Sequence, residues 1–285
     1  SQLAAQMAKD ANKKKEDKIK ELQEFIRRFS ANKSKSKQAT SRKKLLDKIE
    51  LDDISPSSRR YPFIGFEIGR TIGKDILEVT NLSKTLDGVE LLKDVSFRID
   101  PYDKVGFIGN ELAITTLFEI LSGEMEPDSG EVKWGVTTTL SYMPKDNAMF
   151  FDKDLNLIDW LRQYSEEQSE SYIRGFLGRM LFSKDEALKP SDVLSGGEKV
   201  RMMLSKMMLS DSNTIILDQP TNHLDLESII SVNNGVIAFK GNVLFSSHDT
   251  EFMDSIANKI IKIDENGATT YDMKYEEYIE KYIEK

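Results

Sequence analysis

The chain has 285 residues, of which 39% are hydrophobic and 31% charged, and its formal net charge is −8. This length accommodates one large domain with an extension, or two small domains. The absence of cysteine excludes disulfides and thiolate metal sites. No run of about 18 apolar residues is present, so the sequence predicts no membrane-spanning helix. The first residues lack the apolar core of a signal peptide and read as the middle of a helix, so we expect the chain to begin inside a longer protein.

Charge is distributed unevenly along the chain. Residues 1–44 contain 14 Lys and Arg against 5 Asp and Glu, a net charge of +9, so the other residues carry −17. Apolar residues recur at helical spacing from Ile19 to Phe29, which predicts a helix packing on one partner helix within a basic arm over 1–60. Such an arm is either merely solvated or a contact surface for a polyanion. The cations that would make such contacts are Lys13, Lys14, Lys15, Arg27, Arg28, Lys33, Lys35, Lys37, Arg42, Lys43 and Lys44.

A Ser-Pro-Ser-Ser sequence at 55–58 interrupts the helical pattern, and we expect a connecting segment over 61–75. From residue 76 to about 270, short apolar runs alternate with helical stretches, a pattern typical of an α/β domain whose sheet has parallel strands. A C-terminal helix is expected over 271–285. The expected strands are 76–79, 95–99, 105–109, 214–218 and 242–247.

Two subdomains are expected within the α/β region. An antiparallel portion lies near residues 76–100, and amphipathic patterns predict a helical subdomain at about 150–210. The large aromatic side chains of that subdomain are expected in the core rather than as ligand platforms. They are Trp160, Phe176 and Phe182.

The strongest local signal is Ser195-Gly196-Gly197-Glu198, directly before an amphipathic helix that we expect to extend to Leu209. Adjacent glycines allow the backbone to approach a ligand closely, and a helix N-terminus offers free N–H groups to a phosphate. Taken alone, the same residues also fit an ordinary serine-capped helix start.

Two later segments favour the phosphate interpretation. An apolar strand ends at Asp218, whose carboxylate can hold Mg²⁺ through water, and Gln219 follows it. A second apolar strand ends shortly before His248. The chain has two histidines, and both lie in these segments.

The order of these motifs resembles the nucleotide-binding domain of ABC proteins over about residues 76–265. The sequence TNHLDLES from Thr221, preceded by a basic helical arm, is similar to the ABC-F class in particular. The resemblance implies an α/β ABC-type P-loop domain with antiparallel β and helical subdomains, and ATP and Mg²⁺ as ligands. It places Mg²⁺ at Thr115 and Asp218 and the catalytic positions at Gln219 and His248. Its cofactor-binding positions are Gly109, Asn110, Thr115, Thr116, Lys145, Ser195, Gly196, Gly197, Glu198 and Asp225.

The same resemblance implies the setting in which the domain works. ABC-F proteins place two nucleotide-binding domains in one chain, joined by a helical linker, and lack transmembrane domains. As a family they bind the ribosome, with the linker reaching toward tRNA. We therefore expect a cytoplasmic protein with no membrane partner. Its expected partners are an N-terminal nucleotide-binding domain of the same full-length chain and the rRNA and tRNA of the ribosome.

The phosphate loop departs from the family pattern G-x-x-x-x-G-K-[ST]. The segment that begins at Gly109 lacks the second glycine and the lysine. Depending on the alignment, Ile114 or Thr115 stands at the lysine position, and in both registers the cation that would contact the β- and γ-phosphates is absent. We also expect the bulky Ile114 to obstruct the backbone cradle for the phosphates.

Three further positions depart from the family pattern. Gln219 replaces the glutamate that polarises the attacking water, and an amide cannot act as a base. Lys145 stands where the Q-loop glutamine is expected, and Leu86 stands where an aromatic ring often stacks on adenine. Because ABC sites are composite, we hypothesise that this domain mainly supplies its signature, Ser195 to Glu198, to a site whose Walker A motif lies in the N-terminal domain. Hydrolysis by this half alone is expected to be weak or absent.

Three functional classes stay open at this point. The first is a ribosome-associated ABC-F ATPase acting in translation or in protection from ribosome-targeting antibiotics. The second is the ATPase subunit of a membrane transporter, which the fused basic arm disfavours. The third is a nucleotide-insensitive scaffold that has kept the fold and lost the chemistry.

Overall fold

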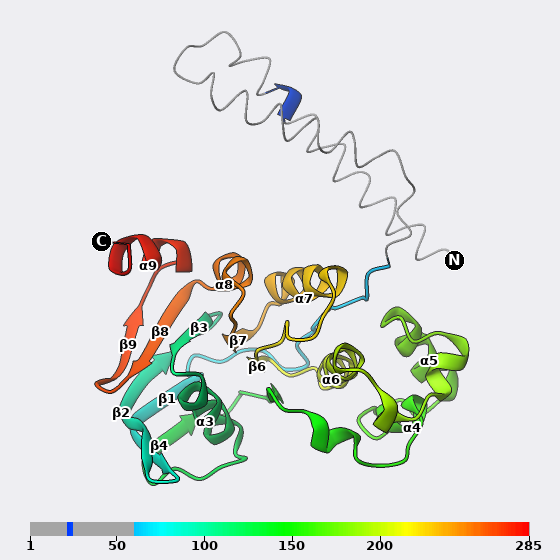
Figure 1. Ribbon diagram of the computed structural model, residues 1–285, viewed down its shortest axis with the longest axis horizontal. Coiled ribbons are helices and arrows are strands. Elements are labelled where there is room, and N and C mark those ends of the chain that lie inside the picture. The colour runs from blue at the N-terminus through cyan, green and yellow to red at the C-terminus, as the bar shows by residue number, and fades with distance from the viewer. Residues whose placement is uncertain (1–21, 25–59, 285) are drawn as a thin grey trace. The chain divides into compact units, whose positions relative to one another are not determined.

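A computed structural model of the chain describes residues 22–24 and 60–284. The chain divides into two compact units, residues 1–59 and residues 60–285. In the first unit, residues 22–24 are helical. The predictions for the rest of the arm, including all eleven candidate polyanion contacts, lie outside the described residues. The second unit is a layered α/β domain (Figure 1).

A three-stranded antiparallel sheet begins the second unit, in the order β2-β1-β4. Leu77 in the central strand lies opposite Ile99 on one side and Trp134 on the other, so apolar side chains meet across the sheet. The antiparallel portion expected near 76–100 corresponds to β1 and β2. The bounds of the strands are Leu77–Leu86 for β1, Val89–Ile99 for β2 and Ser129–Trp134 for β4.

The second sheet has six strands in the order β5-β6-β7-β3-β8-β9. Pairs from β5 to β8 are parallel, and β9 pairs antiparallel with β8 at one edge. The α/β class with a largely parallel sheet that the sequence predicted is therefore confirmed. The strand bounds are Lys104–Gly109 for β3, Leu140–Met143 for β5, Thr214–Asp218 for β6, Asn242–Ser246 for β7, Lys259–Asp264 for β8 and Gly267–Tyr271 for β9.

Helices cover both faces of this sheet (Figure 1). Every residue of β6 and β7 is buried, which explains why both read as continuous apolar runs instead of alternating ones. Apart from the region between β5 and α6, the helices described in this unit are α3 (Glu111–Ser122), α6 (Gly196–Leu209), α7 (Leu226–Ala238), α8 (Thr250–Ile256) and α9 (Tyr275–Tyr282).

The two sheet faces lead into two separate hydrophobic cores. Ile215 and Leu217 of β6 face the core formed with α6, α7 and α8, whereas Ile216 between them faces α3 and the three-stranded sheet. This alternation follows from the two-residue period of a strand. On the α3 side, Phe107 packs edge-on against Phe97 and Phe118, with ring centroids 5.6 and 5.2 Å away.

Short helices between β5 and α6 form a compact region beside the sheet. Trp160 stacks on Phe151 at 4.8 Å between ring centroids and donates its indole N–H to the backbone oxygen of Phe150. Trp160, Phe176 and Phe182 are all buried, as expected for core residues. The elements of this region are η1 (Ala148–Phe151), α4 (Leu157–Arg162), α5 (Glu170–Arg179), η2 (Lys184–Leu188) and η3 (Ser191–Val193).

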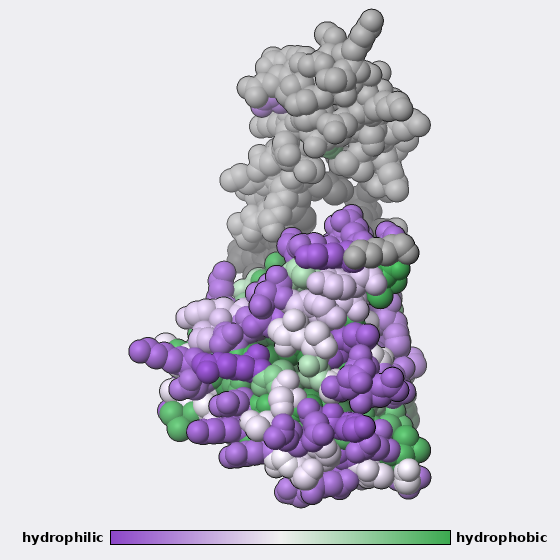
Figure 2. Space-filling view, turned by 90° about the vertical axis from the view of Figure 1, so that its left-hand side faces the viewer, coloured by the Kyte–Doolittle hydropathy of each residue, from purple (hydrophilic) through white to green (hydrophobic). Residues whose placement is uncertain are grey.

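Hydrophilic residues predominate on the face drawn in Figure 2, with smaller hydrophobic areas between them. Among the described residues, no helix has the length and apolarity needed to cross a bilayer.

Truncating Phe107 to alanine should lower the free energy of unfolding by about 3–5 kcal/mol, because it opens a cavity between the buried rings of Phe97 and Phe118. Urea titration followed by circular dichroism measures this loss. The matched control is Val136→Ala, because Val136 is 92% exposed. A similar loss in both variants would contradict the packing described for Phe107.

Candidate functional site

The sequence-predicted Walker residues meet at one edge of the six-stranded sheet. Strands β6, β7 and β3 are neighbours and parallel, so their carboxyl ends lie together. Asp218 ends β6 opposite Ser246, which ends β7, and Gly109 ends β3. Crevices at the carboxyl ends of parallel strands are the usual ligand sites of open α/β sheets.

The connection from β3 to α3 is a single residue. Gly109 has φ +136°, and a Cβ at this position would lie 2.1 Å from the backbone oxygen of Ile263, so only glycine fits here. Asn110 then caps α3 by accepting a hydrogen bond from the Ala113 N–H at 3.1 Å. No loop is left to wrap phosphates, and the cap already uses one of the free amides at the helix start.

The expectation that Ile114 obstructs a phosphate cradle is wrong. Its side chain is 4% exposed and belongs to the hydrophobic core on the α3 side. Because α3 begins at Glu111, residue 114 already lies within the helix, and helical periodicity turns it inward. Thr116 is also buried, and its hydroxyl has no hydrogen-bond partner.

Asp218 is the most buried acidic group at the site, with 1% of its surface exposed. Its two carboxylate oxygens accept hydrogen bonds from the hydroxyls of Thr115 at 2.7 Å and Ser246 at 2.8 Å. Burial raises the pKa of Asp218, although these two hydrogen bonds and Lys145 act in the opposite direction. Thr115 and Asp218, the two residues predicted to hold Mg²⁺, are therefore neighbours in space and are hydrogen-bonded to each other.

Gln219 has a left-handed backbone conformation, with φ +54°. Such a conformation in a residue other than glycine costs of the order of 1 kcal/mol and is found mostly where surrounding structure imposes it. Here its N–H donates to the oxygen of Ser246 at 3.1 Å, and its side-chain oxygen accepts from the His248 N–H at 3.3 Å. The side chain therefore ties the end of β6 to the segment after β7.

Glu111, which no sequence motif had indicated, lies between Lys145 and His248 at this edge. Its carboxylate forms an ion pair with Lys145, which follows β5, and lies 3.1 Å from Nε2 of His248, which follows β7. The one available signal was an acidic residue inside the shortened phosphate loop. Its partners could not be read from the chain, since they lie 34 and 137 residues away.

The signature segment lies at the start of α6, where Ser195 is the N-cap. The Ser195 hydroxyl accepts from the Glu198 N–H at 3.3 Å, and the Glu198 carboxylate accepts from the Ser195 N–H at 2.8 Å. This reciprocal pair is a capping box, and Lys189 adds an ion pair to Glu198 at 2.7 Å. Ser195 and Gly196 are exposed, so the helix end is open to a partner.

The glycine pair of the signature packs against the segment after β6. A Cβ on Gly196 would lie 3.0 Å from the His223 ring, and one on Gly197 would lie 2.6 Å from the His223 backbone oxygen. His223 itself has φ +65°. Close backbone packing therefore explains why position 197 requires glycine, independently of any ligand.

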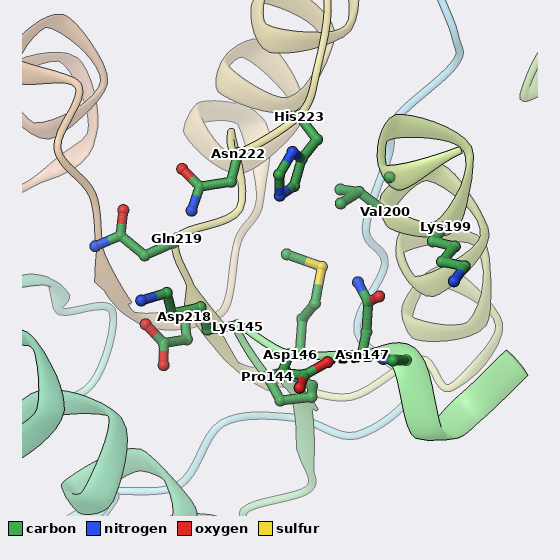
Figure 3. A pocket seen from close by; sticks show the side chains of 13 residues that line it. Pro144, Lys145, Asp146, Asn147, Lys199, Val200, Asp218, Gln219, Asn222 and His223 are labelled. Carbon is green, nitrogen blue, oxygen red and sulfur yellow. Dashed lines mark hydrogen bonds between the residues drawn. The ribbon is translucent and has the colours of Figure 1, made fainter. Parts of the chain in front are cut away.

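A pocket of about 140 Å³ separates the signature helix from the strand ends (Figure 3). Its lining includes Lys199, Asn222 and His223, which the sequence motifs did not assign to the site. Asp225, predicted to contact the cofactor, caps α7 by accepting from the Ser228 N–H at 2.8 Å. The remaining lining comes from residues 143–148 at and after the end of β5, from Asp218 and Gln219, and from Gly196 and Val200 of α6.

The residues at the carboxyl ends of these strands, as arranged in this structure, do not fit a bound nucleoside triphosphate with Mg²⁺. The cation and the histidine that would face a phosphate already contact Glu111, and the two metal-binding positions bond to each other. Among the residues that the structure describes, no cluster of three or more His, Cys, Asp or Glu could hold a metal ion.

A family model described as ABC transporter matches residues 92–222, and a second with the same description matches residues 2–66. The chain is 63% identical over 283 residues to the ABC transporter ATP-binding protein YkpA of Bacillus subtilis, covering 98% of this chain and 52% of that protein. It is 42% identical to the probable ATP-binding protein YbiT of Escherichia coli O157:H7, covering 94% and 51%.

A more distant relative is ABC transporter F family member 5 of Arabidopsis thaliana, 28% identical over 95% of this chain and 40% of that protein. The chain thus spans about half the length of the curated relatives it matches. Among solved structures, an ATP-binding subunit of an ABC transporter superposes with a TM-score of 0.58 at 20% identity, over 73% of this chain and 93% of that one. At this identity the superposition concerns the fold alone.

Replacing Asp218 with asparagine should remove a pH-dependent cost of folding. Because the folded state raises the pKa of Asp218, the folded protein binds more protons than the unfolded one just above pH 3.8, and stability falls as pH rises. The stability of Asp218→Asn relative to the parent chain should therefore increase between pH 4 and pH 7, by about 1.4 kcal/mol per unit of raised pKa. Urea unfolding at both pH values measures this, and a difference independent of pH would contradict it.

Proposed function

The chain carries an ATP-binding domain of the ABC transporter class, and from this premise we propose that it is part of a ribosome-associated ABC-F protein that acts in translation or in protection of the ribosome from antibiotics. Relatives named as F family members in Arabidopsis thaliana support the ABC-F assignment, because they match both the arm and the domain. The chain's span of about half its curated relatives leaves room for a second nucleotide-binding domain.

The proposal assigns different roles to the signature at the start of α6 and to the Walker residues at the strand ends. The observation that carries it is the contrast between the exposed signature and the Walker edge, meaning the carboxyl ends of β6, β7 and β3 with the start of α3, where Glu111 already contacts other side chains. Ser195 and Gly196 are exposed at the start of a 14-residue helix, whereas Glu111 already engages Lys145 and His248. This domain therefore presents its signature to a nucleotide that the N-terminal domain holds.

The signature is built to present donors without distortion. The capping box fixes the backbone at Ser195, and the packing of Gly197 on His223 anchors the next turn. Free amides at such a helix start favour negative charge, so a phosphate approaching from outside meets a preformed site. Pre-organised donors of this kind stabilise charge that develops during hydrolysis.

The basic arm supports the ribosomal part of the proposal. Its net charge of +9 over residues 1–44 contrasts with −17 on the remainder. An acidic domain is repelled by nucleic acid, so contacts with rRNA or tRNA fall to the arm. A nucleotide-insensitive scaffold is the second candidate, because the filled Walker edge is equally expected of a domain that no longer needs ATP.

Ser195→Arg in the full-length protein should lower ATP turnover by about tenfold or more, because a long side chain at the open helix end displaces the phosphate that this end would meet. Steady-state phosphate release measures turnover. Thr270→Arg adds the same charge at an exposed position of β9 and should leave turnover unchanged. Unchanged turnover in a folded Ser195→Arg protein would refute the shared site and favour the scaffold.

Binding to the ribosome should depend on the cations of the arm. Replacing Lys33, Lys35 and Lys37 together with glutamate should reduce the fraction of full-length protein that co-sediments with ribosomes in the presence of ATP or a non-hydrolysable analogue. The slope of log affinity against log salt should fall by about 2, because three phosphate contacts are lost.

The matched control for that experiment changes the same number of charges on the domain. It replaces the exposed Lys93, Lys133 and Lys153 with glutamate. Equal losses in both triple variants would show general charge repulsion instead of an arm contact. Absence of the parent protein from the ribosome pellet under every nucleotide condition would reject the ribosomal proposal.

A further inference from the structure

We propose that the Glu111 carboxylate is a built-in substitute for a nucleotide phosphate, which holds the Walker edge of this domain together and excludes ATP from it. The inference rests on the proposed function for the identity of the excluded ligand. It goes beyond the missing lysine, because it assigns the exclusion to a residue that is present and not to one that is lost.

The first observation is position. Glu111 is the first residue of α3 and directly follows the cap Asn110. In a P-loop, the strand, loop and helix start surround the phosphates with backbone N–H groups and place negative charge at the positive end of the helix dipole. In this chain the loop has been reduced to Asn110, and the negative charge at the helix start belongs to the protein.

The second observation is the set of groups that the carboxylate engages. Lys145 follows β5 and His248 follows β7, so the two side chains come from loops that leave different strands. One oxygen of Glu111 pairs with Lys145, and the other lies 3.1 Å from the imidazole of His248. A phosphate would offer the same features to the same two groups, namely negative charge and several acceptor oxygens.

The third observation is electrostatic. A phosphate entering this edge would approach Glu111, and behind it the buried Asp218, while the ammonium group of Lys145 is already paired. The Glu111 side chain is 38% exposed, so solvent weakens the repulsion between its carboxylate and an entering phosphate without removing it. Entry of a nucleotide therefore requires Glu111 to release both partners first, which lowers the apparent affinity.

This arrangement makes the closed state of the edge independent of nucleotide. In an ordinary switch, the segments after β5 and β7 are brought together when a phosphate arrives and released when it leaves. Here Glu111 is covalently part of the domain, so its effective concentration at Lys145 and His248 does not depend on ATP. The domain would present its signature in one fixed geometry throughout the partner site's cycle.

Hydrogen exchange on the 285-residue chain tests the first half of the proposal. In the parent chain, saturating MgATP should leave exchange in segments 143–149 and 246–250 unchanged. Glu111→Gln keeps the size of the side chain and removes its charge, and should speed exchange in both segments severalfold. Glu126→Gln, which changes the same charge at an exposed position in another loop, should have no effect.

Equilibrium binding of a fluorescent ATP analogue with Mg²⁺ tests the second half. Glu111→Gln should bind at least tenfold more tightly than the parent chain, and Glu111→Ala should confirm the direction. Circular dichroism verifies that each variant folds. Equal affinities in the parent and both variants, or exchange that does not respond to either substitution, would overturn the proposal.

These outcomes are separable from those of the shared site. The signature is probed by Ser195→Arg in the full-length protein, where a partner holds the nucleotide, whereas the Glu111 variants are measured on this chain by itself. Tight MgATP binding by the parent chain would overturn the Glu111 inference and leave the role of the signature standing. Loss of the Ser195 effect would do the reverse.

Discussion

The site depends on the two hydrogen bonds that the buried Asp218 carboxylate accepts. Asp218 joins three segments that are distant in sequence, because it ends β6 and accepts hydrogen bonds from Thr115 in α3 and Ser246 in β7. A buried carboxylate without partners would be costly, so these hydroxyls hold the helix and the neighbouring strand at a set distance. Glu111, Gln219 and His248 lie close in sequence to Thr115, Asp218 and Ser246, so these hydrogen bonds bring their segments together.

Around that carboxylate, the domain divides into a closed part and an open part. On the closed side, Glu111 links the segments after β5 and β7, and Gln219 adds a further link to His248. On the open side, the capping box leaves Ser195 exposed at the start of α6. The two parts meet through His223, whose ring lies against Gly196 and lines the pocket, and whose backbone oxygen lies against Gly197.

This division suits a domain that works as half of a composite site. A signature must present the same geometry each time a nucleotide arrives from the partner, which favours a rigid support. Internal charge pairs such as the one between Glu111 and Lys145 provide that support without a ligand. The division is equally consistent with a domain whose nucleotide chemistry has been lost altogether, and the properties of the full-length protein separate these two outcomes.

Much of the site could be predicted because some residue types have few alternatives in their setting. A serine and two glycines before an amphipathic helix, or an aspartate that ends an apolar strand, are strong local signals. Strands with weaker patterns were missed, notably β4 and β8, since the apolar residues of β8 are interrupted by Lys262 and those of β4 are few. Ile114 was misplaced because a loop was assumed where the helix had already begun.

By itself, the sequence determined the class of fold, the absence of a phosphate-loop lysine and the charge contrast between arm and domain, because each depends on residue type and order along the chain. Only the tertiary structure decided what fills the Walker edge. Glu111, Lys145 and His248 lie on three separate segments, and their contact exists only once β5, β7 and β3 share a sheet. The strength of such charge pairs depends on the distance between the charges in space, and the spacing of the residues along the chain does not determine that distance.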